Sequence, residues 1–485
     1  MDLHLSFEGQ RNRTGEVYRR LREAILEGRL RPREALPSSR DLARRLKVSR
    51  TTVLSAYERL RSEGFLTSKA GAGTFVTEGI RPRSPAGPAD SPLRPRAVWD
   101  SVREGRDMSA TRAEFDFRPG IPDASRFPFA AWRARVSRYL HANEVGTGSH
   151  IGAAGHPGFC SAIARHISVS RAVRCTADDV LVTNGSQQAI DLIARVLLEP
   201  GDKVAVEDPG YPLPRGALHA YGCRVAGVPV DDEGLVVDAI PRGVRLVYVT
   251  PSHQYPLGMA MSMARRQALL AWANRVNAAI VEDDYDSEFR YGPRPLEPLQ
   301  TLDASGRVLY IGSFSKVLLP TLRLGFVVAP PPLHAALRKA KHLADWHTAV
   351  PMQAAAAQFI DDGLLAHHIR RMRRVYSERH ERIVRALERD FRGYLIPLPS
   401  TGGLHLAALL DGPRRRTLDQ TIVERAAAQG VAVFPLAYHF VATPPRPGLL
   451  IGYGAIPTER IEPGLRRLRA CFSSPSPRTG MNKSP

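Results

Sequence analysis

A lysine at position 316 stands among small hydroxyl residues, with an arginine seven positions further along the chain. The amine of a shielded lysine can form a Schiff base with an aldehyde cofactor such as pyridoxal phosphate. Ser313 and Ser315 could bind the phosphate of that cofactor through their hydroxyls, and Arg323 could hold it with a bidentate, charge-assisted contact. The segment therefore predicts a pyridoxal phosphate site in which Lys316 forms the Schiff base.

Two segments that follow apolar runs could complete this site. Residues 182–190 run from a strand through Gly185 into a helix, so the amides of Gly185, Ser186 and Gln187 would lie at a helix N-terminus, where anions bind. Many α/β loops share this pattern, and alone it is a weak signal. Tyr211 follows another strand and could stack on a pyridine ring, although a tyrosine that only packs fits the position equally well.

Four carboxylates cluster where the apolar run at 279–282 ends. So many charges are costly to bury without a function or cationic partners. An aspartate beside a protonated ring nitrogen keeps a pyridinium charged and makes it an electron sink. We predict Asp283 in this role and Tyr285 as the donor to the ring oxygen. Asp284 and Asp286 are expected in salt bridges or behind the residues that touch the cofactor.

The elements that must position these residues belong to a large α/β domain. Residues 114–472 alternate β-branched runs with helical stretches, which is typical of a mainly parallel sheet with flanking helices. At 485 residues and 43% apolar content, the chain can build more than one core. Residues 79–113, rich in proline, glycine and serine, are predicted to be a flexible linker, and 473–485 a disordered tail.

Residues 11–78 form a separate basic and helical segment. Ser38 is predicted to cap one helix, with Asp41 three residues later, and Ser49 to cap the next. The buried stripe of that second helix would consist of the apolar residues at helical spacing, which are Val53, Ala56, Tyr57 and Leu60. Two short helices joined by a tight turn are typical of a helix-turn-helix, and the two short strands predicted within 65–76 would form a wing. A helical subdomain with a hairpin is the alternative interpretation.

Residues 21–76 resemble the GntR-type winged-helix domain over their whole length. The resemblance implies that DNA is contacted by Arg40, Ser49, Arg50, Thr51, Thr52, Lys69 and Gly73, the last at the tip of the wing. Arginine discriminates bases, whereas hydroxyls and wing amides mostly fix register on phosphates. The GntR pattern has glycine where this chain has Arg33.

The motifs TNGSQQAIDL, EDPGYP, TPSHQYPLG, VEDDYDSEFRY and SFSKVLLPTLRLGF resemble the fold-type I, aminotransferase-like domain of MocR-type regulators. This resemblance implies the same roles for the residues named above, and it places Ser186, Gln187, Ser313, Ser315 and Arg323 around the phosphate. It adds His253 and Gln254, which match the family's His-Gln pair. It also implies a homodimer, whose two recognition helices would bind paired half-sites in double-stranded DNA.

Two departures from that pattern concern the ligand. The family often has a tyrosine in a segment that contributes to the partner subunit's site, and here residues 150–155 begin with His150 instead. Aminotransferases bind a substrate carboxylate through an arginine near the C-terminus, in the strand that corresponds to residues 449–454. No arginine lies within that strand here, and the nearest is Arg446. These departures favour a different amine, or the cofactor itself, as the signal.

Composition sets further limits. The net charge of +20 favours polyanionic partners, although an arginine-rich proteome explains it equally well. Four scattered cysteines, no zinc spacing and no long apolar run predict a cytoplasmic protein with no metal site and no membrane contact. We predict a pyridoxal-phosphate-dependent transcriptional regulator that senses the cofactor or an amino compound. The alternatives are an active aminotransferase with a DNA-binding module, and a regulator whose large domain is purely structural.

Overall fold

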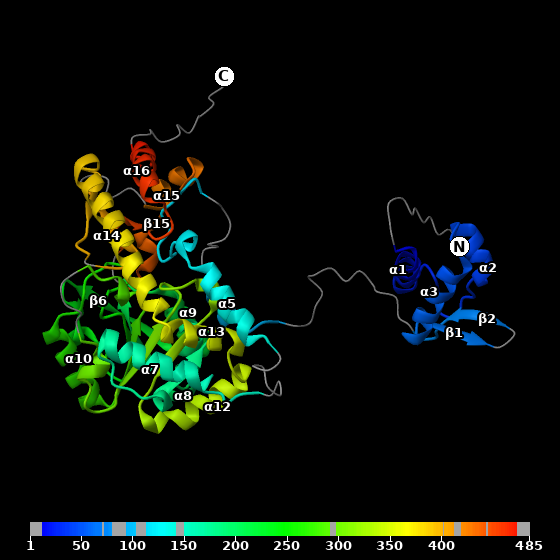
Figure 1. The fold of residues 1–485 in the computed structure, drawn as a ribbon, viewed down its shortest axis with the longest axis horizontal. Coiled ribbons are helices and arrows are strands. Elements are labelled where there is room, and N and C mark those ends of the chain that lie inside the picture. Colours follow the sequence, from blue (N-terminus) through cyan, green and yellow to red (C-terminus); the bar gives the residue numbers. More distant parts are fainter. Residues whose placement is uncertain are drawn as a thin grey trace, which may run out of the picture. The chain divides into compact units, whose positions relative to one another are not determined.

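The computed structural model describes residues 12–69, 72–79, 94–102, 113–141, 150–291, 297–400, 402–411, 419–442 and 445–472. The chain divides into two compact units between Arg96 and Ala97 (Figure 1). The predicted tail and most of the predicted linker lie outside the described residues. Within that linker, Val98–Ser101 form a short helix, α4, and Ser101 Oγ lies 2.9 Å from His219 Nε2 of the large unit. This part of the linker is therefore tied to the large unit.

The N-terminal unit is a winged helix-turn-helix, as predicted. Its elements are α1 (Arg13–Leu26), α2 (Ser39–Leu46), α3 (Arg50–Ser62), β1 (Leu66–Lys69) and β2 (Gly73–Val76), with the two strands antiparallel. Both predicted helix caps are confirmed, because Ser38 Oγ accepts the Asp41 amide at 3.2 Å and Ser49 Oγ accepts the Thr52 amide at 3.0 Å. The predicted stripe on α3 is buried in the core of this unit.

Arg33 has a backbone conformation that favours glycine. Its φ is 67°, in the left-handed region, and its amide donates to Val76 O at 3.0 Å. The turn is therefore fixed against the wing with a strained non-glycine residue, at the position where the GntR pattern has glycine.

Arg33→Gly should stabilise the N-terminal unit relative to Arg33→Ala by about 1 kcal/mol, because a side chain at positive φ is strained. Both variants remove the exposed ion pair with Glu78. The free energy of local opening, measured by hydrogen exchange at amides of α1 and α3, checks this. Equal protection in the two variants would show that the turn carries no strain.

In the described part of the large unit, the main sheet has eight strands in the order β4-β11-β10-β9-β8-β5-β6-β7. Its strands are β4 (Val180–Thr183), β5 (Lys203–Asp208), β6 (Arg224–Asp231), β7 (Gly234–Leu235), β8 (Val244–Val249), β9 (Ala279–Asp284), β10 (Val308–Ser313) and β11 (Gly325–Val328). The neighbours β10, β9, β8, β5 and β6 are parallel, whereas β11 is antiparallel to β10 and β4. The predicted α/β class with a mainly parallel sheet is confirmed.

Helices cover both faces of this sheet. Because successive residues of a strand point to opposite faces, Val281 packs in one apolar cluster and Ile280 in another. The covering helices are α5 (Phe129–Tyr139), α7 (Pro157–Arg171), α8 (Ser186–Leu197), α9 (Pro212–Tyr221), α10 (Met263–Val276), α11 (Leu299–Leu302), α12 (His334–Asp345) and α13 (Val350–Asp361). Residues of α8, α9 and α12 share the cluster of Val281, and those of α10 share the cluster of Ile280.

A smaller layer follows the long helix α14 (Leu364–Asp390), which runs from α13 to the part that carries α15 and α16 (Figure 1). It holds an antiparallel sheet with the order β12-β13-β16-β15. Its elements are β12 (Leu395–Pro397), β13 (His405–Leu410), α15 (Asp419–Ala428), β15 (Phe434–Pro435), β16 (Gly448–Gly452) and α16 (Ile461–Ala470), and β14 (Val431–Ala432) pairs with β3 (Phe115–Asp116). Among the described helices, none has the length and apolar content that a membrane span requires.

Candidate cofactor site and DNA-binding surface

The carboxyl ends of β4, β10, β9, β8 and β5 meet at one edge of the large sheet, because these strands run in the same direction. Ligands of open α/β sheets bind outside this edge. Every sequence-predicted cofactor residue lies at it: Ser186 and Gln187 follow β4, Tyr211 follows β5, His253 and Gln254 follow β8, Asp283 and Tyr285 end or follow β9, Ser313, Ser315 and Lys316 end or follow β10, and Arg323 precedes β11.

Lys316 is half-buried at this edge, and its Nζ donates to Gly120 O at 2.6 Å. Burial lowers the pKa of its amine, although Asp286 and Asp283 act to raise it. The lowered pKa increases the neutral fraction of the amine, which is the form that attacks a carbonyl. Gly120 has a φ of 73°, which favours glycine, and a Cβ there would lie 2.8 Å from Nζ and displace the lysine side chain.

Asp283 carries an unpartnered buried oxygen. Its Oδ2 accepts a hydrogen bond from Tyr248 OH at 2.5 Å, whereas Oδ1 is buried without a partner among the described residues. Burial raises the pKa of this carboxyl to about 7, and Asp284 acts in the same direction. An orphaned carboxylate oxygen of this kind fits a protonated ring nitrogen, which would supply both the charge and the hydrogen bond.

Asp283→Asn should stabilise the cofactor-free protein by up to about 4 kcal/mol near pH 8. The folded state holds the carboxyl proton up to pH about 7, whereas the unfolded chain loses it near pH 4. Stability therefore falls as pH rises through this window, and the asparagine removes the loss. Urea unfolding at several pH values checks this. Asp284→Asn is the control and should destabilise, because Arg171 overcomes the effect of burial and lowers the pKa of Asp284.

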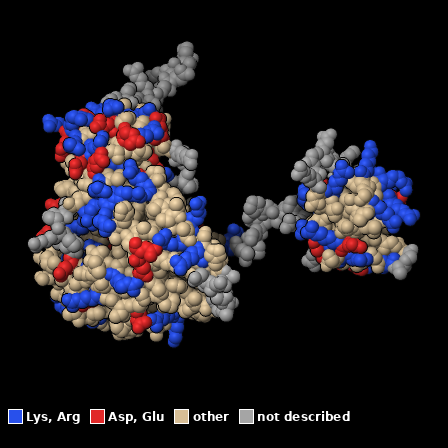
Figure 2. Space-filling view, viewed as in Figure 1, with Lys and Arg blue, Asp and Glu red and all other residues tan. Residues whose placement is uncertain are grey.

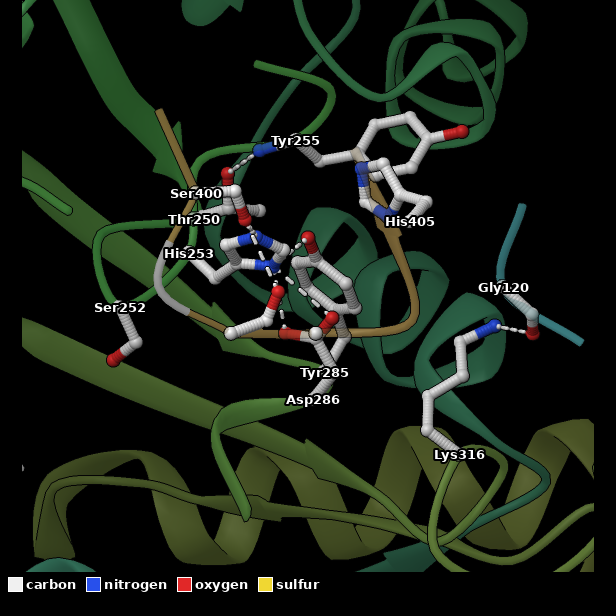
Figure 3. A network of polar contacts seen from close by, with 12 residues as sticks. Gly120, Thr250, Ser252, His253, Tyr255, Tyr285, Asp286, Lys316, Ser400 and His405 are labelled. Carbon is white, nitrogen blue, oxygen red and sulfur yellow. Dashed lines mark hydrogen bonds and ion pairs between the residues drawn. The ribbon is translucent and has the colours of Figure 1, made fainter. Parts of the chain in front are cut away.

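Tyr285 contacts a histidine, which in turn contacts an aspartate (Figure 3). His253 Nδ1 lies 2.9 Å from Tyr285 OH and 3.0 Å from Asp286 Oδ2, and its Nε2 lies 3.3 Å from Ser400 Oγ. Burial raises the pKa of Tyr285 well above its ordinary value, so its hydroxyl stays protonated and available as a donor. His253 therefore positions the tyrosine hydroxyl.

Arg323 and the start of α8 lie together at this sheet edge. Arg323 Nη2 donates to Asn184 O at 2.7 Å, and a Cβ at Gly185 would lie 2.7 Å from the same nitrogen. Ser186 and Gln187 form the first turn of α8, where backbone amides attract anions. Ser313 Oγ donates to Ser315 Oγ at 3.0 Å. These groups make a cationic corner that fits a phosphate.

Tyr211 and Gln254 differ in how they are placed. The Tyr211 ring meets the Tyr255 ring edge to face, with centroids 5.3 Å apart. Burial raises the pKa of the Tyr211 hydroxyl, Asp283 acts in the same direction, and Arg323 acts to lower it. The Gln254 amide is already engaged, donating to Pro209 O at 2.9 Å and Tyr255 O at 2.8 Å. Gln254 therefore orders its loop through these bonds, while Tyr211 lies among the cofactor residues.

Some functional contacts had no local sequence signal. Tyr248 lies within β8 and looks like an ordinary core residue, yet it bonds Asp283. The salt bridge expected for Asp284 is confirmed, since Arg171 Nε lies 2.7 Å from its Oδ2, and Asp286 lies behind Tyr285, 3.0 Å from His253 Nδ1. Among the described residues, no group of acidic, histidine or cysteine side chains has the arrangement of a metal site.

His150 and Arg446, the positions at which the sequence departs from the family pattern, have different surroundings. His150 stacks on Trp346 with ring centroids 3.9 Å apart. Arg446 is exposed, and the buried Arg379 of α14 donates to Tyr453 O and Gly454 O beside β16 and pairs with Asp123 at 2.6 Å. The guanidinium of Arg379 is thus used to join α14 to the smaller layer.

The predicted DNA-contacting residues lie at the starts of α2 and α3 and on the wing. Arg40, Ser49, Arg50, Thr51, Lys69 and Gly73 are exposed, and Thr52 is half-buried. The Thr52 hydroxyl lies 2.8 Å from Ser49 Oγ, so these two hydroxyls are partly engaged in capping α3. Arg50 and Thr51 are the residues most open to a groove, and Lys69 pairs with Gly73 across the two strands.

Comparison with known proteins agrees with both units. Residues 13–76 match the bacterial regulatory proteins of the gntR family, and residues 121–468 match aminotransferase class I and II. The chain is 36% identical to the probable rhizopine catabolism regulatory protein MocR of Rhizobium meliloti over 463 residues, covering 94% of this chain and 93% of that protein.

This chain belongs to the MocR-type GntR regulators. A second MocR-type relative, the HTH-type pyridoxine biosynthesis transcriptional regulator PdxR of Corynebacterium glutamicum, is 31% identical over 443 residues and 91% of each chain. The large unit of this MocR-type chain is also similar to LysN, the alpha-aminoadipate aminotransferase of Thermus thermophilus, solved with N-(5'-phosphopyridoxyl)-L-leucine. That similarity has a TM-score of 0.70 at 28% identity, covering 77% of this chain and 96% of LysN.

Proposed function

We propose that this MocR-type chain is a pyridoxal-phosphate-dependent transcriptional regulator that senses the cofactor or a small amine. The observation that carries the proposal is the orphaned Oδ1 of Asp283 at the sheet edge that also holds Lys316. A buried carboxylate oxygen without a partner is costly unless a ligand completes it. The same chain carries a winged helix, through which occupancy of the cofactor site would change DNA binding.

Each residue has a distinct task at this site. Pyridoxal phosphate, when bound, supplies an aldehyde that reacts with amines and a ring that accepts electrons. Lys316 would hold the cofactor covalently, and Asp283 would keep a proton on its ring nitrogen. Tyr285, positioned by His253, would donate to the ring oxygen, and Tyr211 would cover the ring. The phosphate would be held by Ser186, Gln187, Ser313, Ser315 and Arg323.

The DNA-binding part of the proposal follows the winged-helix surface. Residues 11–78 would bind double-stranded DNA through Arg50 and its neighbours, and residues 114–472 would bind the cofactor and form a homodimer. Two recognition helices require paired half-sites. A ligand can change operator binding only if it has different affinities for two arrangements of the dimer. We place the protein in the cytoplasm, where its operator would be.

An active aminotransferase is the second candidate, because Lys316, Asp283 and Tyr285 would also serve transamination. The absence of arginine from β16 disfavours an α-amino acid substrate. Single-turnover mixing of amines with the cofactor-loaded protein separates the two. A regulator should react slowly and not turn over, whereas steady-state turnover of ~1–1000 per second would identify an enzyme.

Footprinting on DNA from beside the gene for this protein tests the regulator directly. We expect two protected half-sites whose occupancy changes when pyridoxal phosphate is added. Protection of a single half-site would contradict the homodimer. No sequence-dependent protection at any cofactor concentration would contradict the proposed function.

A further inference from the structure

A cavity of about 550 Å³ lies behind the candidate cofactor site. It opens between the end of α7, the turn η5 (Ser287–Phe289), α13 and α14. Because alternate residues of β9 point to opposite faces, Asp284 faces this side of the sheet and Asp283 faces the other. The volume is within the range of about 300–1000 Å³ that small-molecule sites occupy.

Arginines dominate the lining of the cavity. Among the described residues, its lining includes five arginines and two carboxylates, which are Arg165, Arg171, Arg290, Arg370, Arg373, Glu288 and Asp361. Figure 2 shows Lys and Arg side chains gathered where α14 crosses the visible face of the large unit. Such an excess of fork-shaped donors fits carboxylate or phosphate groups.

Two of these arginines are neutralised within the structure. Arg165 pairs with Asp361 at 2.6 Å, and the buried Arg171 pairs with Asp284 at 2.7 Å. The charges of the other three lack such a partner among the described residues. Burial and Asp284 raise the pKa of Glu288 to about 7, which reduces the negative charge available to them.

The three remaining guanidinium groups have unused donors. Arg290 Nη1 donates to Ser252 O at 3.1 Å, while its buried Nε has no partner among the described residues. Within the part of the chain that the structure describes, Arg373 donates only to the Glu288 carbonyl, at 2.9 and 3.1 Å, which leaves its charge uncompensated. Arg370 is exposed on the same helix face.

We propose that this cavity is a second ligand site, for a small organic anion that carries a carboxylate or phosphate group. Ile360, Ile369 and Ala366 line part of the same cavity and would cover a short apolar portion of the ligand. Arg290 is half-buried and recessed, so the convex backbone of a DNA duplex would not reach its Nε. A small molecule fits this concave shape better than a nucleic acid does.

The cavity is joined to the cofactor site through neighbouring residues in the chain. Arg171 Nη2 donates to Ser252 Oγ at 2.7 Å, and Ser252 precedes His253. Asp284, the partner of Arg171, lies between Asp283 and Tyr285. An anion bound by Arg290 would compete with the Ser252 carbonyl for its guanidinium group. Binding at the cavity and binding at the cofactor site would therefore influence each other reciprocally. This coupling rests on the proposed function, whereas the anion site itself does not.

Calorimetric titration of the full-length protein, saturated with pyridoxal phosphate, tests the site. The probes are glutarate and inorganic phosphate, with glutaramide as the neutral counterpart. We expect at least one anion to bind, and Arg370→Gln and Arg373→Gln each to weaken it roughly tenfold or more. Arg374→Gln, an exposed residue of the same helix outside the cavity, should change the affinity less than about twofold.

Three results would overturn the proposal: no binding of either anion, equal binding in the cavity variants, or equal weakening by Arg374→Gln. Arg323→Gln distinguishes the cavity from the phosphate corner of the cofactor site. Anion binding that survives in this variant supports a separate site, and anion binding lost there overturns it. Displacement of the bound anion by random duplex DNA would overturn it in favour of a nucleic acid surface.

Discussion

Lys316→Ala is expected to abolish the visible absorption band that pyridoxal phosphate gives when it is joined to the protein. Lys316 combines a lowered pKa with a place at the same sheet edge as Asp283 and the Arg323 corner. Removing the amine removes the covalent bond, so the cofactor should wash out on desalting. Absorption spectra after desalting measure this directly.

Lys339→Ala, an exposed lysine of α12, is the matched control and should keep the full band. The informative contrary result would be a band that persists in the Lys316 variant. It would mean that another lysine forms the covalent bond. The candidate would be Lys341, which is fully buried and contacts Gln188, Asp345 and Thr348.

Arg50→Ala should cost roughly 1–3 kcal/mol of discrimination between the operator and an unrelated duplex. Arg50 is the first residue of α3, and its side chain makes a long hydrogen bond, 3.4 Å, to Ser39 Oγ. Its guanidinium is therefore available to a base edge. Competition binding at fixed salt measures the discrimination, because salt alone changes the affinity.

Arg61→Ala, near the other end of α3, is the control and should leave the sequence preference unchanged. If Arg50→Ala weakened binding to all duplexes equally, Arg50 would be a phosphate contact instead. An unchanged preference together with unchanged affinity would mean that α3 does not enter the groove.

Local signals predicted the N-terminal unit well. Helix caps depend on residues three positions apart, as with Ser38 and Asp41, and the buried stripe of α3 depends only on helical spacing. Both can be read from a short window. The strained φ of Arg33 was visible only as a departure from the glycine of the pattern, because sequence does not report backbone angles.

The residues predicted for the cofactor site come together at one sheet edge, whereas the contacts between them were not predicted. Lys316 and Asp283 stand in recognisable motifs, but Gly120 reaches Lys316 across 196 positions and Tyr248 reaches Asp283 across 35. Such contacts depend on strand order, which the motifs do not encode. Gln254 likewise matches a motif, but the motif does not indicate that its side-chain amide donates to Pro209 O and Tyr255 O.

The most direct test measures the operator affinity of one preparation with and without pyridoxal phosphate, for the wild-type chain and for Lys316→Ala. If the bound cofactor controls DNA binding, the affinity of the wild-type protein changes on addition, and that of the variant does not. An affinity that is indifferent to the cofactor in the wild type, or that responds equally in the variant, would contradict this account.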